Sequence, residues 1–342
     1  MITTTKDTLP ERYSGILWQN LPLSFQDAIT ATAELGIRYL WIDSLCIVQD
    51  DATDWSEQSS KMAEIYANSY INIALTRLAD GHSGCFSERF CEQEVELDHN
   101  TWICPVKSIE IDGSLEDLPL KVFARIPLTI AHKIFTTDIA NRPTTYYPVD
   151  KPVKASVSAP LLTRAWVFQE RYLAPRTVHF HASEMLWECT SMQRCECTGL
   201  DKLGAAMEQA KNSPASTRLK RLCAENENAT LSEFQLLLLW KYTIAEYTTL
   251  RLTRDSDRLP ALSGIALRFN KGLSSSERDP HYLAGLWNID KTAFIAELLW
   301  EVHGYAQIQS PSTSRLCSPA PPSWSLASLC RVPIQSSTIT LV

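Results

Sequence analysis

The chain has 342 residues, of which 45% are hydrophobic and 21% are charged, as in an ordinary globular protein. Its formal net charge is −7, and no run of lysine or arginine is present, so we expect no nucleic-acid partner. No stretch reads as a membrane span or a secretory signal, and the ten cysteines include no C-x-x-C pair. We therefore expect a cytoplasmic protein with reduced thiols.

The first predicted elements are a helix and a strand. Apolar residues at helical spacing predict a helix over residues 22–36. Ser24, with Asp27 three residues later, is the expected N-cap, and Gly36 is the expected stop. The nearly continuous apolar run at 37–42 predicts a strand buried on both faces.

A second helix and strand follow. Residues 54–69 carry one apolar stripe and begin with Asp54 and Glu57, the spacing of a capping box. Residues 70–76 then predict another strand. Helix, strand, helix and strand joined by short links indicate an α/β fold with a parallel sheet.

The middle of the chain interrupts this alternation. Residues from about 85 to 160 contain only short strand-like pieces, at 101–106 and 120–128, and a proline-bearing segment, and we interpret them as an insertion. The α/β pattern then resumes with one helix and two strands, predicted at 161–173, 176–181 and 184–189.

The second half is mostly helical. Helices are predicted at 231–249, 257–270 and 292–300. We therefore divide the chain into an α/β domain at 20–200, a helical region at 201–304 and a Ser/Pro-rich tail at 305–342.

Asp43 follows the predicted strand at 37–42, where ligands bind in open α/β sheets. It is either a ligand-facing or loop-ordering carboxylate, or a turn residue that accepts hydrogen bonds from the N–H groups of Leu45 or Cys46. Cys46 is either a nucleophile or, as we expect, a buried inert thiol.

Two further groups suggest a metal. Asp50, Asp51 and Asp54 are able to ligate a hard cation, but they lack the spacing of a calcium loop, so we expect a solvated acidic loop. The cysteines at 189, 195 and 197 fit no standard zinc arrangement. We expect no metal site.

The segment RAWVFQER, at 164–171, carries another candidate group. On a helix Trp166 and Glu170 share one face, and the indole would partly desolvate the carboxylate and raise its pKa. Arg164 and Arg171 lie close enough to pair with Glu170 or with a phosphate. The alternative is an ordinary amphipathic helix with Trp166 in the core.

Taken together, these blocks resemble the fungal heterokaryon-incompatibility (HET) domain. The resemblance rests on LPLSFQDAI, LGIRYLWIDSLCIVQDD, IYANSYINIA and RAWVFQERYLAPRTVHF, and on later matches such as YTTLRLTRDSDRLPALSGIA and PPSWSLAS, so that it extends from about residue 20 to 330.

The family is distantly similar to Toll/interleukin-1-receptor (TIR) domains. This resemblance implies a TIR/flavodoxin-like parallel sheet flanked by helices, followed by the helical region. Some TIR domains cleave NAD, and their motif has a glutamate four residues after a tryptophan. The resemblance therefore implies Glu170 as the catalytic residue, Asp43, Trp166, Arg164 and Arg171 as ligand-binding or site-shaping residues, and NAD as a possible substrate rather than an established cofactor.

Three functions follow from the resemblance. The first is a module of fungal nonself recognition and programmed cell death that acts by assembly with protein partners. The second is a TIR-like enzyme that cleaves NAD through Glu170. The third is an inactive relic, because family members usually open with a strand resembling Y-x-A-L-S-Y-x-W-G and residues 1–20 do not match it. We accordingly expect the first strand of the sheet to be missing.

Overall fold

The structure, a computed structural model, describes residues 2–77, 84–86, 107–110, 121–124, 159–181, 184–196, 198, 215–224, 231–274, 279–302, 322, 324–325, 328 and 334–336. Most of the expected insertion and of the Ser/Pro-rich tail lies outside these residues, as does the strand-like piece at 101–106.

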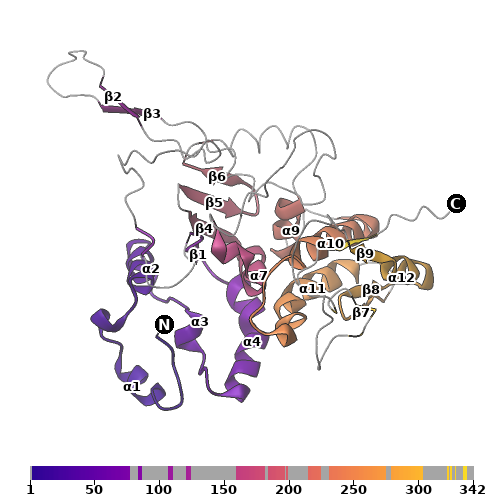
Figure 1. The fold of residues 1–342 in the computed structure, drawn as a ribbon, viewed down its shortest axis with the longest axis horizontal. Coiled ribbons are helices and arrows are strands. Elements are labelled where there is room, and N and C mark those ends of the chain that lie inside the picture. The colour runs from indigo at the N-terminus through magenta and orange to yellow at the C-terminus, as the bar shows by residue number, and fades with distance from the viewer. Residues whose placement is uncertain are drawn as a thin grey trace.

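The N-terminal part of the fold is helical. Its elements are α1 (Leu9–Ser14), the 3₁₀ turn η1 (Trp18–Asn20), α2 (Leu23–Glu34), α3 (Asp43–Cys46) and α4 (Ala52–Ala67). Helices α2 and α4 confirm the helices predicted at 22–36 and 54–69. Figure 1 shows these elements in indigo and purple at one end of the molecule, with α4 reaching toward its centre.

The N-cap prediction for α2 is wrong. Pro22 occupies the N-cap without a side-chain hydrogen bond, and Ser24 is buried inside the first turn. Asp27 does not serve this helix end either. Its Oδ2 accepts hydrogen bonds from the backbone N–H groups of Cys85, at 2.7 Å, and Phe86, at 3.2 Å. The carboxylate thus ties a distant segment to α2.

The predicted stop of α2 is confirmed. Gly36 has a φ of +69°, in the left-handed region that glycine adopts without strain. Its N–H donates to Ala33 O at 2.9 Å, and the N–H of Ile37 donates to Thr32 O at 3.1 Å. These two bonds form a Schellman motif, which satisfies carbonyl groups at the helix end.

The capping residue of α4 is Asp51, so the prediction of Asp54 and Glu57 as a capping box is wrong. The side chain of Asp51 accepts from the N–H groups of Thr53, at 2.9 Å, and Asp54, at 3.3 Å. The carboxylate of Asp54 accepts instead from Val48 N at 2.7 Å. The helix consequently begins two residues before the predicted start.

The strand predicted at 37–42 is also wrong. These residues form no strand, and Arg38 and Tyr39 are exposed rather than buried. Extended backbone becomes a strand only when a neighbouring segment supplies ladder hydrogen bonds. Among the described residues, no strand pairs with this segment.

The central sheet is mixed, which corrects the expectation of a parallel sheet. Its four strands, in spatial order, are β1 (Asn72–Ala74), β4 (Arg176–Phe180), β5 (Met185–Cys189) and β6 (Gln193–Cys195). Only β1 and β4 are parallel, whereas β4 with β5 and β5 with β6 are antiparallel. The links at 181–184 and 190–192 are too short for the crossover that parallel neighbours need.

The strands predicted at 70–76, 176–181 and 184–189 are confirmed as β1, β4 and β5. The described residues also contain three antiparallel pairs outside this sheet: β2 (Lys107–Glu110) with β3 (Lys121–Ala124), β7 (His281–Leu283) with β8 (Leu286–Asn288), and β9 (Trp300–Val302) with β10 (Ile334–Ser336). Strand β3 overlaps the strand-like piece predicted at 120–128. The fold is α/β in the broad sense, while a TIR/flavodoxin-like topology stays a prediction.

The helices predicted at 161–173, 231–249, 257–270 and 292–300 are confirmed. They are preceded or joined by short 3₁₀ turns, and the elements are η3 (Pro160–Thr163), α7 (Ala165–Leu173), α9 (Ala215–Cys223), α10 (Glu233–Tyr247), η4 (Asp255–Asp257), α11 (Pro260–Leu273) and α12 (Lys291–Leu298). Of these, α9 is a further helix that was not predicted from the sequence. Helix α10 begins with a capping box formed by Ser232 and Gln235. Among the described residues, no helix combines the length and apolar character needed to cross a membrane.

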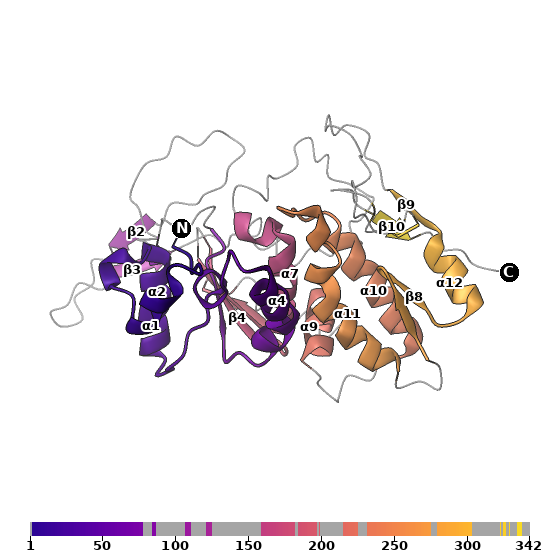
Figure 2. The same cartoon turned by 90° about the horizontal axis from the view of Figure 1, so that it is seen from below.

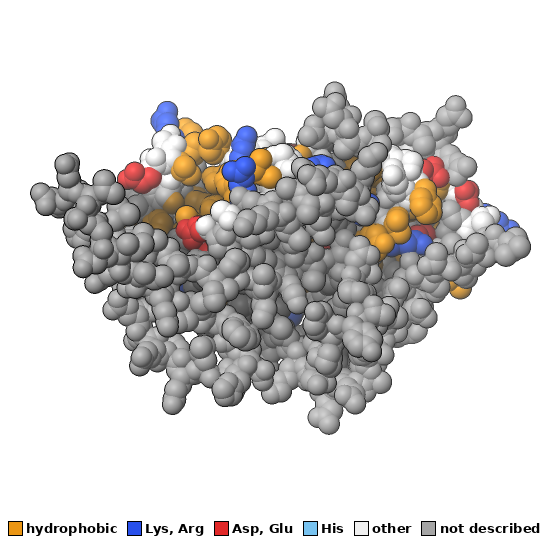
Figure 3. Space-filling view, turned by 90° about the horizontal axis from the view of Figure 1, so that it is seen from above, with side chains coloured by type: hydrophobic (Ala, Val, Ile, Leu, Met, Phe, Trp, Pro, Cys, Tyr) orange, Lys and Arg blue, Asp and Glu red, His pale blue; other side chains and the backbone are white. Residues whose placement is uncertain are grey.

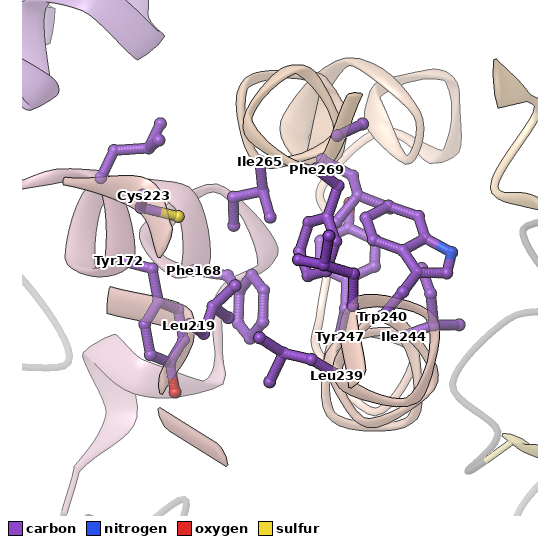
Figure 4. Packing of buried hydrophobic residues seen from close by; sticks show 14 of the residues in the cluster. Phe168, Tyr172, Leu219, Cys223, Leu239, Trp240, Ile244, Tyr247, Ile265 and Phe269 are labelled. Carbon is purple, nitrogen blue, oxygen red and sulfur yellow. The ribbon is translucent and has the colours of Figure 1, made fainter. Parts of the chain in front are cut away.

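The main hydrophobic core lies between α7 and the helical region. Figure 4 shows Phe168 and Tyr172 of α7 on one side of this core and the aromatic side chains of α10 and α11 on the other. The rings of Phe168 and Tyr247 are 5.5 Å apart, and those of Trp240 and Phe269 are 4.9 Å apart, both edge to face. In Figure 2, α7 accordingly lies between the sheet and helices α9 to α11.

Candidate functional site

Glu170 lies at the contact between two helices. It is on α7, which packs against α4, and its side chain is partly buried. The Tyr66 hydroxyl of α4 is near enough to its carboxylate to interact with it. Asp43 and Arg164 are near enough to act on its charge. We call Asp43, Tyr66, Arg164 and Glu170 the Glu170 cluster.

The surroundings of Glu170 favour its neutral form. The pKa of Glu170 is raised from 4.5 to about 7, first by burial and then by the negative charge of Asp43, while Arg164 and the Tyr66 hydroxyl act in the opposite direction. Near pH 7 the carboxyl group is therefore present in both its protonated and its ionised form. That balance suits a group that gives, takes or stabilises charge during a reaction.

Tyr66 is suited to be a steady hydrogen-bond donor. Burial, followed by the charges of Glu170 and Asp43, raises the pKa of its phenol well above the usual value of 10, so the hydroxyl keeps its proton. Its ring packs edge to face against Trp41, with the centroids 5.7 Å apart. Tyr66 thus has both its ring and its hydroxyl held in place. Sequence reasoning did not identify it, because it stands in the apolar stripe of a predicted helix.

Asp43 begins α3 and orders its own turn through an unexpected neighbour. Its Oδ1 accepts from Ser44 N at 2.7 Å. The N–H groups of Leu45 and Cys46, the predicted donors, instead bond to Ile42 O at 3.0 Å and 2.9 Å. The predicted turn partners are therefore wrong, whereas the role of Asp43 as a ligand-facing residue stays a prediction.

The thiol of Cys46 and the acidic side chains that follow Asp43 differ in exposure and in their bonding partners. Cys46 is exposed, so the prediction of a buried thiol is wrong. Asp50 and Asp51 bind the N-terminal segment, because Asp50 accepts from Lys6 N at 2.8 Å and the Lys6 ammonium lies 3.2 Å from Asp51 Oδ2. Together with the backbone bonds of Asp54, these contacts make an ordered loop.

Within the described part of the chain, no group of three or more His, Cys, Asp or Glu side chains is arranged to hold a metal ion. Cys189 and Cys195 lie on neighbouring strands of the sheet, and the residue at 197 is outside the described ones.

Trp166 lies one helical turn before Glu170 and is anchored by two contacts. Its Nε1 donates to Asp257 Oδ2 at 3.2 Å. Its ring meets that of Trp55 on α4 edge to face, with the centroids 6.4 Å apart. Trp166 therefore bridges α4 and the helical region, and sequence reasoning missed the carboxylate that holds it.

Arg171 is directed away from the Glu170 cluster. Its Nε and Nη2 donate to the two carboxylate oxygens of Glu188 on β5, at 2.7 Å and 2.9 Å. Consecutive helical residues point in directions about 100° apart, which explains why Arg171 and Glu170 face different neighbours. Of the five site residues predicted from sequence, Arg171 is the one that the structure places elsewhere.

Glu188 is the centre of a second buried group. His179 Nε2 lies 3.3 Å from its Oε2, Gln193 Nε2 donates to its Oε1 at 3.0 Å, and Lys220 Nζ lies 4.0 Å from its Oε2. The Lys220 ammonium also donates to Arg171 O at 2.6 Å. We call Arg171, His179, Glu188 and Lys220 the Glu188 cluster.

The charges of this cluster compensate one another. Burial opposes ionisation of Glu188, but Arg171 and Lys220 hold its pKa well below the usual value. Burial lowers the pKa of His179 to about 4, so the imidazole is neutral near pH 7. Since a carboxylate only accepts, His179 Nε2 carries the hydrogen, and Nδ1 accepts from the Thr76 hydroxyl at 3.0 Å.

The position of Glu188 in the sequence contained an indication of the Glu188 cluster. In the alternating pattern of β5, Leu186 and Glu188 point to the same buried side. A glutamate at an inward strand position requires a buried cationic partner, although the sequence does not show which residue supplies it.

Comparison with known protein families matches residues 3–170 to the family described as Heterokaryon incompatibility protein (HET). The match contains all members of the Glu170 cluster and ends at Glu170 itself, so it leaves out Glu188 and the helical region. Searches of curated proteins and of solved structures returned no match.

Proposed function

We propose, from the match of residues 3–170 to the heterokaryon-incompatibility (HET) family, that the chain acts in heterokaryon incompatibility as an effector module of fungal nonself recognition that triggers programmed cell death. The Glu170 cluster carries the more specific part of the proposal. A shielded carboxyl group with a pKa of about 7, next to an acid, a cation and a fixed phenol, is an arrangement suited to catalysis.

The reaction that we propose is hydrolysis of the N-glycosidic bond of NAD. The bond between the ribosyl carbon and the nicotinamide nitrogen breaks, and its electron pair leaves with nicotinamide. The resulting positive charge on the ribosyl carbon is stabilised by the ionised Glu170 carboxylate, which is more effective where water is excluded. Water then adds to this carbon and releases its proton, giving ADP-ribose, nicotinamide and a proton.

The neighbours of Glu170 suit such a substrate. The side chain of Arg164 is exposed, and a guanidinium is the preferred partner for phosphate oxygens. Trp41 and Trp55 lie next to Tyr66 and Trp166, so planar apolar surface is present around the site. The spacing of Trp166 and Glu170 on α7 is the feature that the TIR resemblance implies.

The direct test is release of nicotinamide from NAD by the purified chain. We expect release by the wild type and none above background with Glu170→Gln, which keeps the size of the side chain but removes its charge. Glu64→Gln, an exposed change on α4, is the matched control and leaves release unchanged. An inactive wild type, or a Glu170→Gln protein as active as wild type, would contradict the enzymatic proposal.

A second candidate function is assembly with protein partners, as expected from the sequence. Large apolar side chains stand exposed on the N-terminal elements, with Tyr13 83% and Tyr39 81% exposed. Figure 3 shows hydrophobic side chains beside acidic and basic ones on the described part of the face seen from above. Such mixed surfaces are typical of protein interfaces.

Assembly predicts oligomers that grow with concentration and toxicity that persists in Glu170→Gln. Tyr13→Ser combined with Tyr39→Ser would weaken both, whereas Tyr70→Ser, at an exposed tyrosine two residues before β1, is the control. A strictly monomeric protein whose toxicity ignores the two tyrosines would argue against assembly.

A further inference from the structure

Backbone hydrogen bonds connect the helical region to the residues at the start of α7. Arg251 N donates to Thr163 O at 2.7 Å, and Ala165 N donates to Arg251 O at 2.9 Å. Arg251 thereby forms an isolated parallel bridge with Arg164, a member of the Glu170 cluster. The Thr163 carbonyl and the Ala165 N–H, on either side of Arg164, are therefore both hydrogen-bonded to Arg251. These two bonds fix the direction in which the chain enters α7.

A few residues after Arg251, the side chain of Asp257 is hydrogen-bonded to the same helix. It is only 8% exposed, and a buried carboxylate is costly unless its oxygens are hydrogen-bonded. Its Oδ2 accepts from the Trp166 indole at 3.2 Å, and its Oδ1 accepts from the Ser256 hydroxyl at 3.2 Å. The Trp166 contact therefore satisfies one of the two oxygens of a buried acid.

Helix α11 adds further contacts, because it packs against both α4 and α7. A Cβ atom added at Gly264 would lie 2.6 Å from Ala63 Cβ and 2.9 Å from Gln169 Oε1, so α11 touches both helices that carry the Glu170 cluster. Ala63 is on α4, three residues before Tyr66, and Gln169 directly precedes Glu170. The segment 251–257 thus contacts the start of α7, and α11 packs against both α4 and α7.

We propose that Asp257 of the helical region is a positioning residue for the Glu170 site, acting through Trp166, with the backbone of Arg251 fixing Arg164 beside it. The site is then completed by residues outside the HET-matching segment 3–170. Asp257 touches no reacting group. It holds the Trp166 ring against Trp55, and this ring contact fixes α7 against α4 one turn before Glu170. The catalytic consequence rests on the proposed function, but the positioning itself does not.

Fluorine NMR of protein labelled with fluorotryptophan tests the positioning without any activity. Trp166→Phe and Trp55→Phe identify the two resonances, and the signals of Trp240 and Trp287 report on the core. In Asp257→Ala we expect the Trp166 and Trp55 resonances to move while the two core signals stay. In Asp257→Asn we expect Trp166 to keep its wild-type position, because the amide oxygen still accepts the indole hydrogen. Asp279→Ala, an exposed aspartate of the same region, is the control with no change.

An unmoved Trp166 signal in Asp257→Ala, or a shifted one in Asp257→Asn, overturns the inference. If Asp257→Ala does not fold, Asp257→Asn still decides, because a wild-type Trp166 signal supports the inference and any other signal contradicts it. Nicotinamide release provides the separate functional test: a large loss in Asp257→Ala with recovery in Asp257→Asn. A wild type that releases no nicotinamide contradicts the enzymatic proposal, and the NMR shifts then decide the positioning role by themselves.

Discussion

Glu170 lies on helix α7, and Glu188 lies on β5 and is bound by Arg171 of α7. Both carboxyl groups are shielded from water, yet the charges around them are opposite in sign. Glu188 receives two hydrogen bonds from Arg171 and lies near Lys220, and its pKa is held well below the usual value. Glu170 has Asp43 nearby, and burial raises its pKa to about 7. A glutamate side chain is thus held in its ionised form in the Glu188 cluster, whereas in the Glu170 cluster it is present in both its protonated and its ionised form.

This difference separates a structural role from a functional one. A buried charge with full compensation contributes by fixing its neighbours, and it has little capacity to react. A shielded carboxyl whose nearby cation does not outweigh burial and a neighbouring acid destabilises the fold when it ionises, and such a cost is typical of functional sites. If the two glutamates differ in this way, changes at each should have distinct effects on stability, pH dependence and activity.

The largest expected effect is at the Glu188 cluster. Glu188→Gln leaves the buried cations Arg171 and Lys220 without their counter-charge, and removal of one partner of a buried pair costs about 3–5 kcal/mol. Urea unfolding measures this loss. Glu57→Gln removes a carboxylate that is 58% exposed and paired with Lys61, and it should change stability by less than about 1 kcal/mol. Equal costs for the two variants would refute the assignment.

The next effect is a pH dependence that originates at Glu170. Its pKa is about 7 in the folded protein against 4.5 for the ordinary group, so its stabilising contribution is complete below about pH 4.5 and is lost as the pH rises through 7. The loss is about 3 kcal/mol at most. Relative to Glu170→Gln, the wild type should lose unfolding free energy between about pH 5 and pH 8.

Glu188 predicts the opposite slope, because its folded pKa is depressed. Its contribution is present above the ordinary pKa of 4.5 and is lost only as the pH falls through the lower folded value. A stability difference between wild type and Glu170→Gln that does not change with pH would contradict the environment assigned to Glu170.

A smaller effect is expected where α11 meets α4 and α7. Gly264→Ala places a Cβ atom 2.6 Å from Ala63 Cβ, and relief of such a clash costs about 1–3 kcal/mol. Gly272→Ala, on the same helix, meets the flexible side chains of Leu236 at 3.3 Å and Leu222 at 3.5 Å, so it should be neutral or slightly stabilising. Thermal unfolding of both proteins checks this pair. Equal melting temperatures of the two variants would show that α11 is not tightly packed against α4 and α7 at Gly264.

The smallest effect is the influence of Asp43 on Glu170. Asp43→Asn removes a nearby negative charge, so the pKa of Glu170 should fall while burial keeps it above the ordinary value. Carboxyl-carbon NMR titration of Glu170 measures the change. The matched control, Asp50→Asn, alters an acid that bonds to Lys6 N and should leave the Glu170 titration in place.

The sequence predicted helices α2, α4, α7, α10, α11 and α12 because their apolar stripes are long and regular. It failed at residues 37–42, where an apolar run resembles a buried strand but no described segment pairs with it. Pairing is a property of the tertiary fold and leaves no local trace. The mixed sheet is a different case, because the short links at 181–184 and 190–192 exclude a parallel crossover and were visible in the sequence.

The candidate site was predictable only in part. The spacing of Trp166 and Glu170 follows from one helix and was visible in the sequence. Tyr66 and Asp257 join them from positions 104 residues before and 87 residues after Glu170, counted along the printed sequence. Contacts over such distances require the packed structure. Asp257 in particular stands in a charged segment that reads as ordinary surface.

The pH profile of nicotinamide release from NAD is the most direct test of the central claim, that Glu170 is the reactive carboxylate and Glu188 a structural one. The account predicts that kcat/KM for the wild type rises with pH through about 7, as Glu170 ionises, and that Glu170→Gln abolishes release across the range. A profile without an inflection near 7, or release that survives in Glu170→Gln, would contradict it.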